Sequence, residues 1–97
     1  MYDIEYTEKA VADLQCFKKH EQNIIVDGID QRLRYEPTKP NRNRKMLRRN
    51  VTAAWELRIH DFRILYDVDV HVCIIAIKRI GEKRGNALYF RGQKEEL

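Results

Sequence analysis

Basic side chains occupy the polar positions of one alternating segment, residues 54–68. Arg58, His60 and Arg63 share the polar face of the two strands that this segment predicts. Cations on neighbouring strands repel one another unless an anion lies over them. Guanidinium groups match phosphate oxygens with paired hydrogen bonds and stay charged at neutral pH. The pattern therefore indicates a surface that could bind a phosphate group.

The side chains near this surface could supply what metal-free RNA cleavage requires. When a 2′-hydroxyl attacks the adjacent phosphate, the reaction needs a proton acceptor, charge stabilisation on the phosphorane and a donor for the leaving 5′-oxygen. Arginine suits the second need, histidine or glutamate could accept the proton, and tyrosine could donate one or stack on a base. The candidate catalytic residues are Arg58, Arg63, Lys83, Arg84, Tyr89, Glu56 and His60.

A second group of cations lies just before this segment, where five basic residues fall within eight positions. Such a run is usually a solvated basic loop, although this density favours an anionic partner. We therefore predict that it binds an anionic partner, which would be RNA or the ribosome if the family resemblance described below holds, through Arg42, Arg44, Lys45, Arg48 and Arg49.

A structural explanation exists for several of these residues. A single arginine on a strand more often faces solvent or pairs with a nearby carboxylate such as Asp61 or Asp67. A histidine in a turn is usually exposed to water. Trp55 and Phe62 lie on the apolar positions, so they are predicted to be core residues rather than base-stacking residues.

Composition narrows the classes of protein that need to be considered. The 97 residues suit a single domain spanning 1–97, and a net charge of +4 with a pI near 9.2 fits a polyanion or an acidic protein as partner. The sequence contains no serine, so a serine-based triad is excluded. No metal-ligand spacing or dinucleotide or Walker motif occurs, so we expect no metal and no cofactor.

Localisation follows from similar observations. The chain has no apolar run long enough to span a bilayer and no signal-peptide core, so we expect a cytoplasmic protein without a membrane partner. Cys16 and Cys73 are isolated, and they are predicted to be reduced and buried.

The elements that position these residues can be predicted in chain order. A short strand over 2–6 precedes a helix capped by Thr7, with Ala10, Val11, Leu14 and Phe17 on its apolar face. A second helix is predicted to begin near Glu21 and to bury Ile24, Ile25, Ile29 and Leu33, and a loop over 36–43 follows it.

Three strands follow these helices. The hairpin over 54–68 ends in an acidic turn at 67–69, and the apolar run 72–77 predicts a central strand covered on both faces. Residues 87–90 predict a strand or a helical turn, and residues 93–97 a mobile tail. The order is β-α-α-β-β-β, which predicts an α+β fold with an antiparallel helical hairpin on one face of a twisted, mainly antiparallel sheet. The opposite face should carry the polar side chains.

At these residues the sequence resembles the RelE/ParE superfamily of bacterial toxins. The resemblance rests on Trp55-Glu56-Leu57-Arg58-Ile59, Phe62-Arg63-Ile64-Leu65-Tyr66-Asp67-Val68, the strand 72–77, Gly81-Glu82-Lys83-Arg84 and Tyr89. It implies a microbial-ribonuclease-like fold and, for RelE-type members, metal-independent cleavage of mRNA in the ribosomal A site. It also implies a type II toxin–antitoxin system in which a cognate antitoxin inhibits the toxin.

The resemblance assigns the hairpin cations to Arg58 and Arg63, the later cation to Lys83 or Arg84, and the tyrosine to Tyr89. Glu56 stands where RelE has a basic residue, and with His60 it could provide the acid–base groups that other members use. ParE-type members share the fold but poison DNA gyrase, which is the alternative function.

Overall fold

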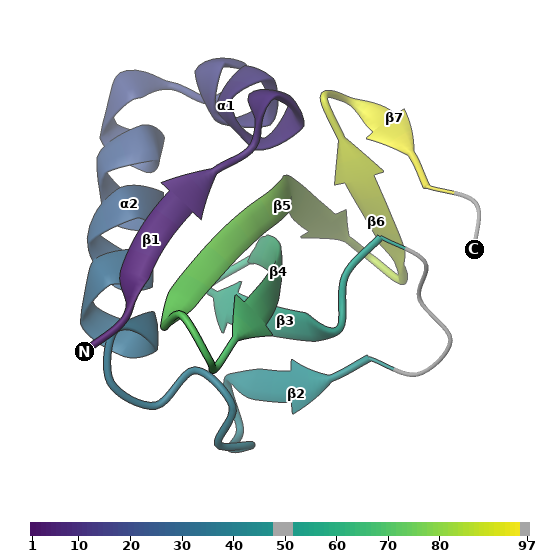
Figure 1. Ribbon diagram of the computed structural model, residues 1–97. Coiled ribbons are helices and arrows are strands. Elements are labelled where there is room, and N and C mark those ends of the chain that lie inside the picture. The colour runs from purple at the N-terminus through teal and green to yellow at the C-terminus, as the bar shows by residue number, and fades with distance from the viewer. Residues whose placement is uncertain (48–51, 96–97) are drawn as a thin grey trace.

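The computed structural model describes residues 1–47 and 52–95, in which two helices cover one face of a seven-stranded sheet (Figure 1). The helices are α1 (Glu8–Gln15) and α2 (Lys19–Leu33). The strands are β1 (Asp3–Tyr6), β2 (Arg44–Met46), β3 (Trp55–Ile59), β4 (Phe62–Asp69), β5 (Ile74–Arg84), β6 (Ala87–Phe90) and β7 (Gln93–Lys94). Strands β2 to β7 are antiparallel neighbours in chain order, whereas β1 pairs in parallel with β5. The predicted α+β fold is confirmed.

The predicted hairpin is formed by β3 and β4. Ile59 lies opposite Phe62, so His60 and Asp61 make the turn, and His60 adopts a φ of 52°. This left-handed conformation is uncommon for a residue with a side chain. Trp55 and Phe62 are 6% and 7% exposed, which confirms that both belong to the core.

Thr7 is the N-cap residue of α1, as the sequence predicted. Its Oγ1 accepts a hydrogen bond from the Ala10 amide at 3.2 Å and donates one to the Ile77 carbonyl at 3.0 Å. The same hydroxyl therefore caps the helix and attaches its first turn to β5.

The apolar faces of the helices were predicted with two errors. Val11 and Ile24 are each 40% exposed, whereas the other predicted apolar residues of both helices pack into or against the core. Helix α2 also begins at Lys19 rather than near Glu21. Gly28 allows α2 to approach the sheet closely, because a Cβ there would lie 2.5 Å from Ile59 Cδ1.

The strand limits differ most from the sequence prediction after residue 66. The acidic residues 67–69 end β4 rather than forming a turn, and the chain reverses over 70–73. Val72 is therefore 60% exposed, and Cys73 is exposed, as is Cys16, so the prediction of buried cysteines is wrong. Strands β2 and β7 were not predicted, since their few polar residues show no apolar alternation.

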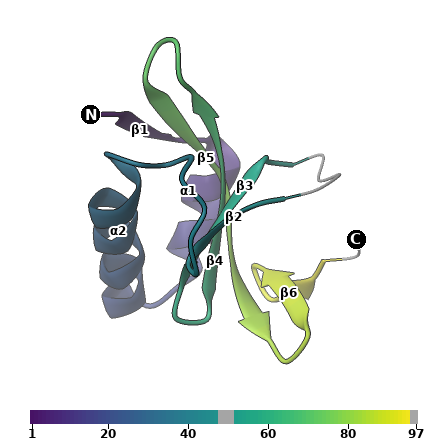
Figure 2. The same cartoon turned by 90° about the horizontal axis from the view of Figure 1, so that it is seen from below.

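The face opposite the helices is only partly polar. Figure 2 shows both helices on one side of the sheet and β6 on the other. On this open face Ala53, Leu65 and Phe90 form a small apolar cluster. Gly81 makes room for it, because a Cβ there would lie 2.6 Å from the Tyr89 carbonyl oxygen and 2.8 Å from the Phe90 ring. Glu56 shares this face, because it lies directly opposite Leu65.

Candidate functional site

Residues of five strands, β2 to β6, surround a cavity of about 160 Å³ on the open face. The register explains how they meet: Lys45 on β2 lies opposite Glu56 on β3, and Arg58 on β3 lies opposite Arg63 on β4. The cavity is lined by Lys45, Glu56, Arg58, Arg63, Lys83, Asn86, Ala87 and Leu88. We call its five charged residues, Lys45, Glu56, Arg58, Arg63 and Lys83, the open-face cluster.

Glu56 is the carboxylate of this cluster. Its side chain is only 10% exposed, and its Oε1 lies 3.3 Å from Arg58 Nε and 4.0 Å from Lys45 Nζ. A buried charge needs such partners, because water no longer stabilises it. The carboxylate is thus a nearly buried group held between two cations on the open face.

Arg63 is oriented by the hairpin turn. Its Nη1 donates hydrogen bonds to the carbonyl oxygens of His60 at 2.8 Å and Phe62 at 3.0 Å. The Nε and Nη2 groups donate none to the residues that the structure describes. These groups are available to a ligand on a guanidinium whose position is already fixed.

The charge balance of the cluster favours an anionic ligand. Arg58 and Arg63 are direct cross-strand neighbours, an arrangement that destabilises a sheet when both residues carry the same charge. Four cations and a single carboxylate line the cavity, and two of these cations, Lys45 and Arg58, lie within 4.0 Å of the carboxylate. A phosphate bound here would offset the excess positive charge, and the arginines could hold it in two directions.

The structure separates Lys83 from Arg84. The two are consecutive on β5, so their side chains point to opposite faces. Lys83 lines the cavity, whereas Arg84 Nε contacts Glu82 Oε1 at 2.7 Å and its guanidinium lies 4.9 Å from the ring centre of Tyr89. Arg84 and Tyr89 line a different cavity, beside Cys16 and Phe17 at the end of α1.

The remaining predicted site residues are spread over the surrounding surface. His60 is exposed in the hairpin turn and contributes its carbonyl group to Arg63 rather than a side chain to the cavity. Arg44 points to the helix side of β2, and Arg42 is exposed in the preceding loop. Arg48 and Arg49 lie outside the described residues.

One ionic site was missed at the sequence level. Asp13 on α1 is fully buried, and its carboxylate accepts hydrogen bonds from Arg79 Nε at 2.7 Å, Arg91 Nε at 2.7 Å and the Ile80 amide at 3.0 Å. Burial acts to raise the pKa of Asp13, but these hydrogen bonds outweigh it and hold the pKa below its ordinary value. A charged residue at helical spacing from buried Ala10 was the available signal.

Arg79 and Arg91 connect this carboxylate to the open face. The Arg79 guanidinium lies 4.2 Å from the ring centre of Phe90, a member of the apolar cluster there. Arg91 forms the turn between β6 and β7. Asp13 therefore attaches the C-terminal hairpin, which carries Leu88 of the cavity, to helix α1.

In residues 1–47 and 52–95, no group of three or more histidine, cysteine, aspartate or glutamate side chains could hold a metal ion. Within the same part of the chain, neither helix has the length and apolar character needed to cross a bilayer.

Solved structures of RelE-type proteins have the same fold. A chain of the RelBE2 toxin–antitoxin complex of Mycobacterium tuberculosis is 26% identical, with a TM-score of 0.74 over 84% of this chain and 98% of that chain. A chain of the RelE–RelB complex of Pyrococcus horikoshii is 24% identical, with a TM-score of 0.68 over 89% and 98%. The isolated RelE toxin of Escherichia coli is 14% identical, with a TM-score of 0.66 over 87% and 86%. The fold therefore defines the class of small RelE-like toxins.

The sequence identifies the family within this class. The family model for the ParE toxin of type II toxin–antitoxin systems matches residues 4–86. The chain therefore belongs to the ParE toxin family of the RelE/ParE superfamily, and it is a toxin of a type II toxin–antitoxin system. No curated protein sequence matches it.

Proposed function

We propose that this toxin is an endoribonuclease that cuts mRNA on the ribosome and thereby stops translation. The observation that carries the proposal is the open-face cluster, in which Glu56 lies among four cations. A binding surface for phosphate alone needs no buried carboxylate, since a carboxylate repels the ligand. An enzyme that deprotonates a 2′-hydroxyl beside that phosphate does need a proton acceptor.

Each residue of the cluster has a role in this reaction. Arg58 and Arg63 bind the non-bridging oxygens of the scissile phosphate and stabilise the phosphorane, as the resemblance to RelE-type toxins also implies. Glu56 takes the proton from the attacking 2′-hydroxyl. Lys45 and Lys83 are ammonium groups that can protonate the leaving 5′-oxygen, and the reaction proceeds without a metal ion.

The proposed nuclease function also implies which partners the toxin has. The substrate is ribosome-bound mRNA, so the toxin acts in the cytoplasm. Its basic segment 42–49 contacts ribosomal RNA, since exposed Arg42 adds positive charge next to the cluster, to which exposed Lys45 of the same segment belongs. A cognate antitoxin inhibits it, because the M. tuberculosis and P. horikoshii relatives are solved as toxin–antitoxin complexes.

Primer extension after induced expression tests the proposal in cells. Translated messages should show discrete cuts in frame with codons during growth arrest. Arg63→Ala should abolish the cuts, whereas the matched variant Arg84→Ala, whose side chain lies outside the cavity, should keep them. Intact messages during growth arrest would refute the nuclease function.

The family match favours a second candidate function. The matching model describes ParE, and Glu56 replaces a cation of the RelE pattern. A ParE-type toxin would poison DNA gyrase instead of cutting RNA. Gyrase-linked DNA breaks in cells with intact messages would establish this alternative, and unaffected supercoiling by purified gyrase would exclude it.

A further inference from the structure

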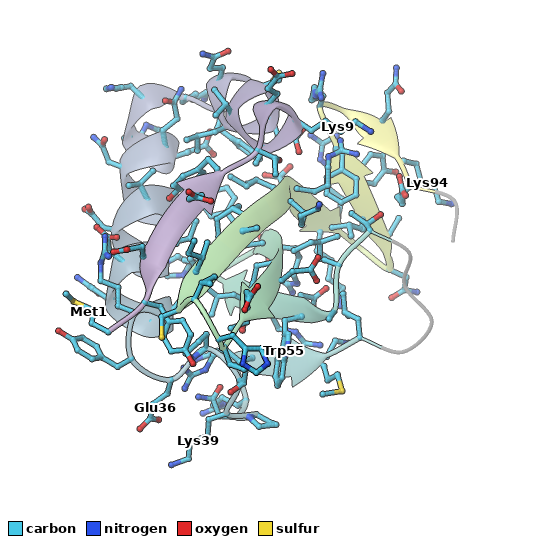
Figure 3. All side chains as sticks on the ribbon, in the orientation of Figure 1. Met1, Lys9, Glu36, Lys39, Trp55 and Lys94 are labelled. Atoms are coloured by element: carbon cyan, nitrogen blue, oxygen red, sulfur yellow. The ribbon has the colours of Figure 1, made fainter. Side chains whose placement is uncertain are left out.

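A second cavity, of about 310 Å³, lies on the other side of β2 from the open-face cluster. It is formed where the end of α2, the loop before β2 and β2 itself meet. Its lining includes the polar residues Arg32, Tyr35, Glu36, Asn41, Asn43 and Arg44. Figure 3 shows Glu36 at this edge of the molecule, with Lys39 close to it.

The two arginines of this cavity are held in place by backbone carbonyl groups. Arg44 Nη1 donates to the carbonyl oxygen of Arg32 at 2.8 Å and to that of Glu36. Arg32 Nη1 donates to the Arg58 carbonyl oxygen at 3.2 Å. The Nε and Nη2 groups of both arginines donate no hydrogen bond within residues 1–47 and 52–95, so they remain available to an anion.

Tyr35 provides an aromatic surface beside these cations. It is 72% exposed, which is unusual for a large aromatic side chain, and within the described residues its ring stacks on no other ring. Asn41 Oδ1 accepts hydrogen bonds from the amides of Asn43 and Arg44, which fixes its side-chain amide at the rim. The Glu36 carboxylate lies 3.9 Å from Lys39 Nζ, so the acidic group of this cavity has a cation of its own.

The two cavities are connected around the edge strand β2. Arg44 and Lys45 are consecutive, so one points into the second cavity and the other into the open-face cluster. Arg58 joins them as well, because Arg32 holds its carbonyl group while its guanidinium lies in the cluster. A polyanion bound at the open-face cluster could therefore continue around β2 and remain in contact with positively charged side chains.

We infer that the second cavity binds a nucleotide of single-stranded RNA next to the scissile phosphate. The base stacks on Tyr35, its polar edge meets the asparagine amides, and its phosphate lies on Arg32 and Arg44. A nucleotide would contact the fixed cations, the exposed ring and the amide groups, whereas an acidic peptide would contact the cations alone. The cavity therefore matches a nucleotide better. The inference rests on the proposed function, since it extends the same RNA beyond the cut.

The test measures how much an uncleavable message increases the affinity of the toxin for ribosomes. Ribosomes carry either no message or a message with 2′-deoxynucleotides at the A site. Tyr35→Ala should reduce the message-dependent increase about 5- to 150-fold, the range for losing one stacked base. Tyr35→Phe should retain it, because the ring remains. The matched control is Val72→Ala, an exposed apolar residue of the β4–β5 turn.

Three other outcomes are decisive. If Arg63→Ala weakens message-dependent binding but Tyr35→Ala does not, the second cavity binds no RNA and the proposed function stands. If the unmodified toxin gains no affinity from a message, the proposed function itself fails. If Tyr35→Ala weakens binding of the antitoxin and leaves message binding unchanged, the cavity is a protein-binding site and the inference is wrong.

Discussion

The two faces of the sheet are built from the same strands but serve different purposes. On the helix side, Leu57, Ile64 and Ile77 are completely buried and pack against α1 and α2. On the open face, the intervening residues Glu56, Arg58 and Arg63 gather charge around a cavity. Successive side chains of a strand point to opposite faces of the sheet. The same strand can therefore contribute core residues on one face and residues of the candidate site on the other.

The open face contains a repulsion between like charges that lowers the stability of the fold. Arg58 opposite Arg63 is unfavourable in a free toxin, and Glu56, whose carboxylate lies 3.3 Å from Arg58 Nε, reduces the repulsion. The helix side has no such conflict among its core residues. Changes on the open face should therefore affect activity more than folding, and changes on the helix side should do the reverse.

Glu56→Gln should have the largest effect and should act mainly on activity. The amide keeps the shape of the carboxylate but cannot accept the proton, so RNA cleavage should fall about 10²- to 10⁴-fold. The free energy of unfolding should fall by only about 1 kcal/mol, because the two cations that pair with Glu56 are themselves about half exposed. The measurements are ribosome-dependent cleavage rate and urea unfolding. Glu82→Gln, outside the cavity, is the control and should cleave normally.

Asp13→Asn should have the largest effect on stability. The substitution removes the buried charge that Arg79 and Arg91 share, and leaving the mostly buried Arg79 without its counter-charge costs about 3 kcal/mol. Urea unfolding should show this loss, and Asp27→Asn at an exposed position should not. An unchanged free energy of unfolding would show that the C-terminal hairpin does not depend on this carboxylate.

The pH dependence of stability provides an independent check on Asp13. Its pKa is lower in the folded than in the unfolded protein, so its carboxylate stabilises the fold above the unfolded pKa of about 4. This stabilisation should be lost as the pH falls below about 4. Unfolding measured from pH 6 down to pH 2 should therefore show a steeper loss in the natural protein than in Asp13→Asn.

Gly81→Ala should disturb the open face from its apolar side. The added Cβ would lie 2.6 Å from the Tyr89 carbonyl oxygen, so β6 must move, at a cost of about 1–3 kcal/mol. The same movement displaces Leu88 at the cavity, so cleavage should also decrease. Gly85→Ala is a control for the steric effect. An added Cβ there would meet no atom within 4 Å, so only the φ of 60° opposes a side chain.

Tyr66→Phe should have the smallest effect and should be limited to stability. The Tyr66 hydroxyl donates to the Pro37 carbonyl oxygen at 2.6 Å and holds the loop after α2 against the core. Loss of this buried hydrogen bond should cost about 1–2 kcal/mol in urea unfolding. Tyr35→Phe loses only an exposed hydroxyl and should unfold like the natural protein.

The sequence predicted the hairpin and its two faces because a period of two directly indicates which residues share a side. Arg58 and Arg63 could be grouped on that basis, and the structure places them opposite each other. The choice between Lys83 and Arg84 could not be made, because it depends on how far β5 continues. The structure extends β5 to Arg84, so alternation assigns Lys83 to the cavity.

The features that were missed depend on distant pairing. Asp13 meets Arg79 and Arg91, which are 66 and 78 positions away in the sequence, so no local pattern could join them. Strand β2 has three residues, two of them basic, and exists because β3 pairs with it. The second cavity depends in turn on β2, since Arg44 lines it only when that strand is in place.

The nuclease function can be tested on ribosomes programmed with two messages that differ by one atom. One message has a 2′-hydroxyl at the nucleotide to be cut, and the other has hydrogen there. The open-face cluster predicts cleavage of the first message by purified toxin and no cleavage of the second, although both bind. Equal cleavage of both would contradict attack by the 2′-hydroxyl, and cleavage of neither would contradict the nuclease function altogether.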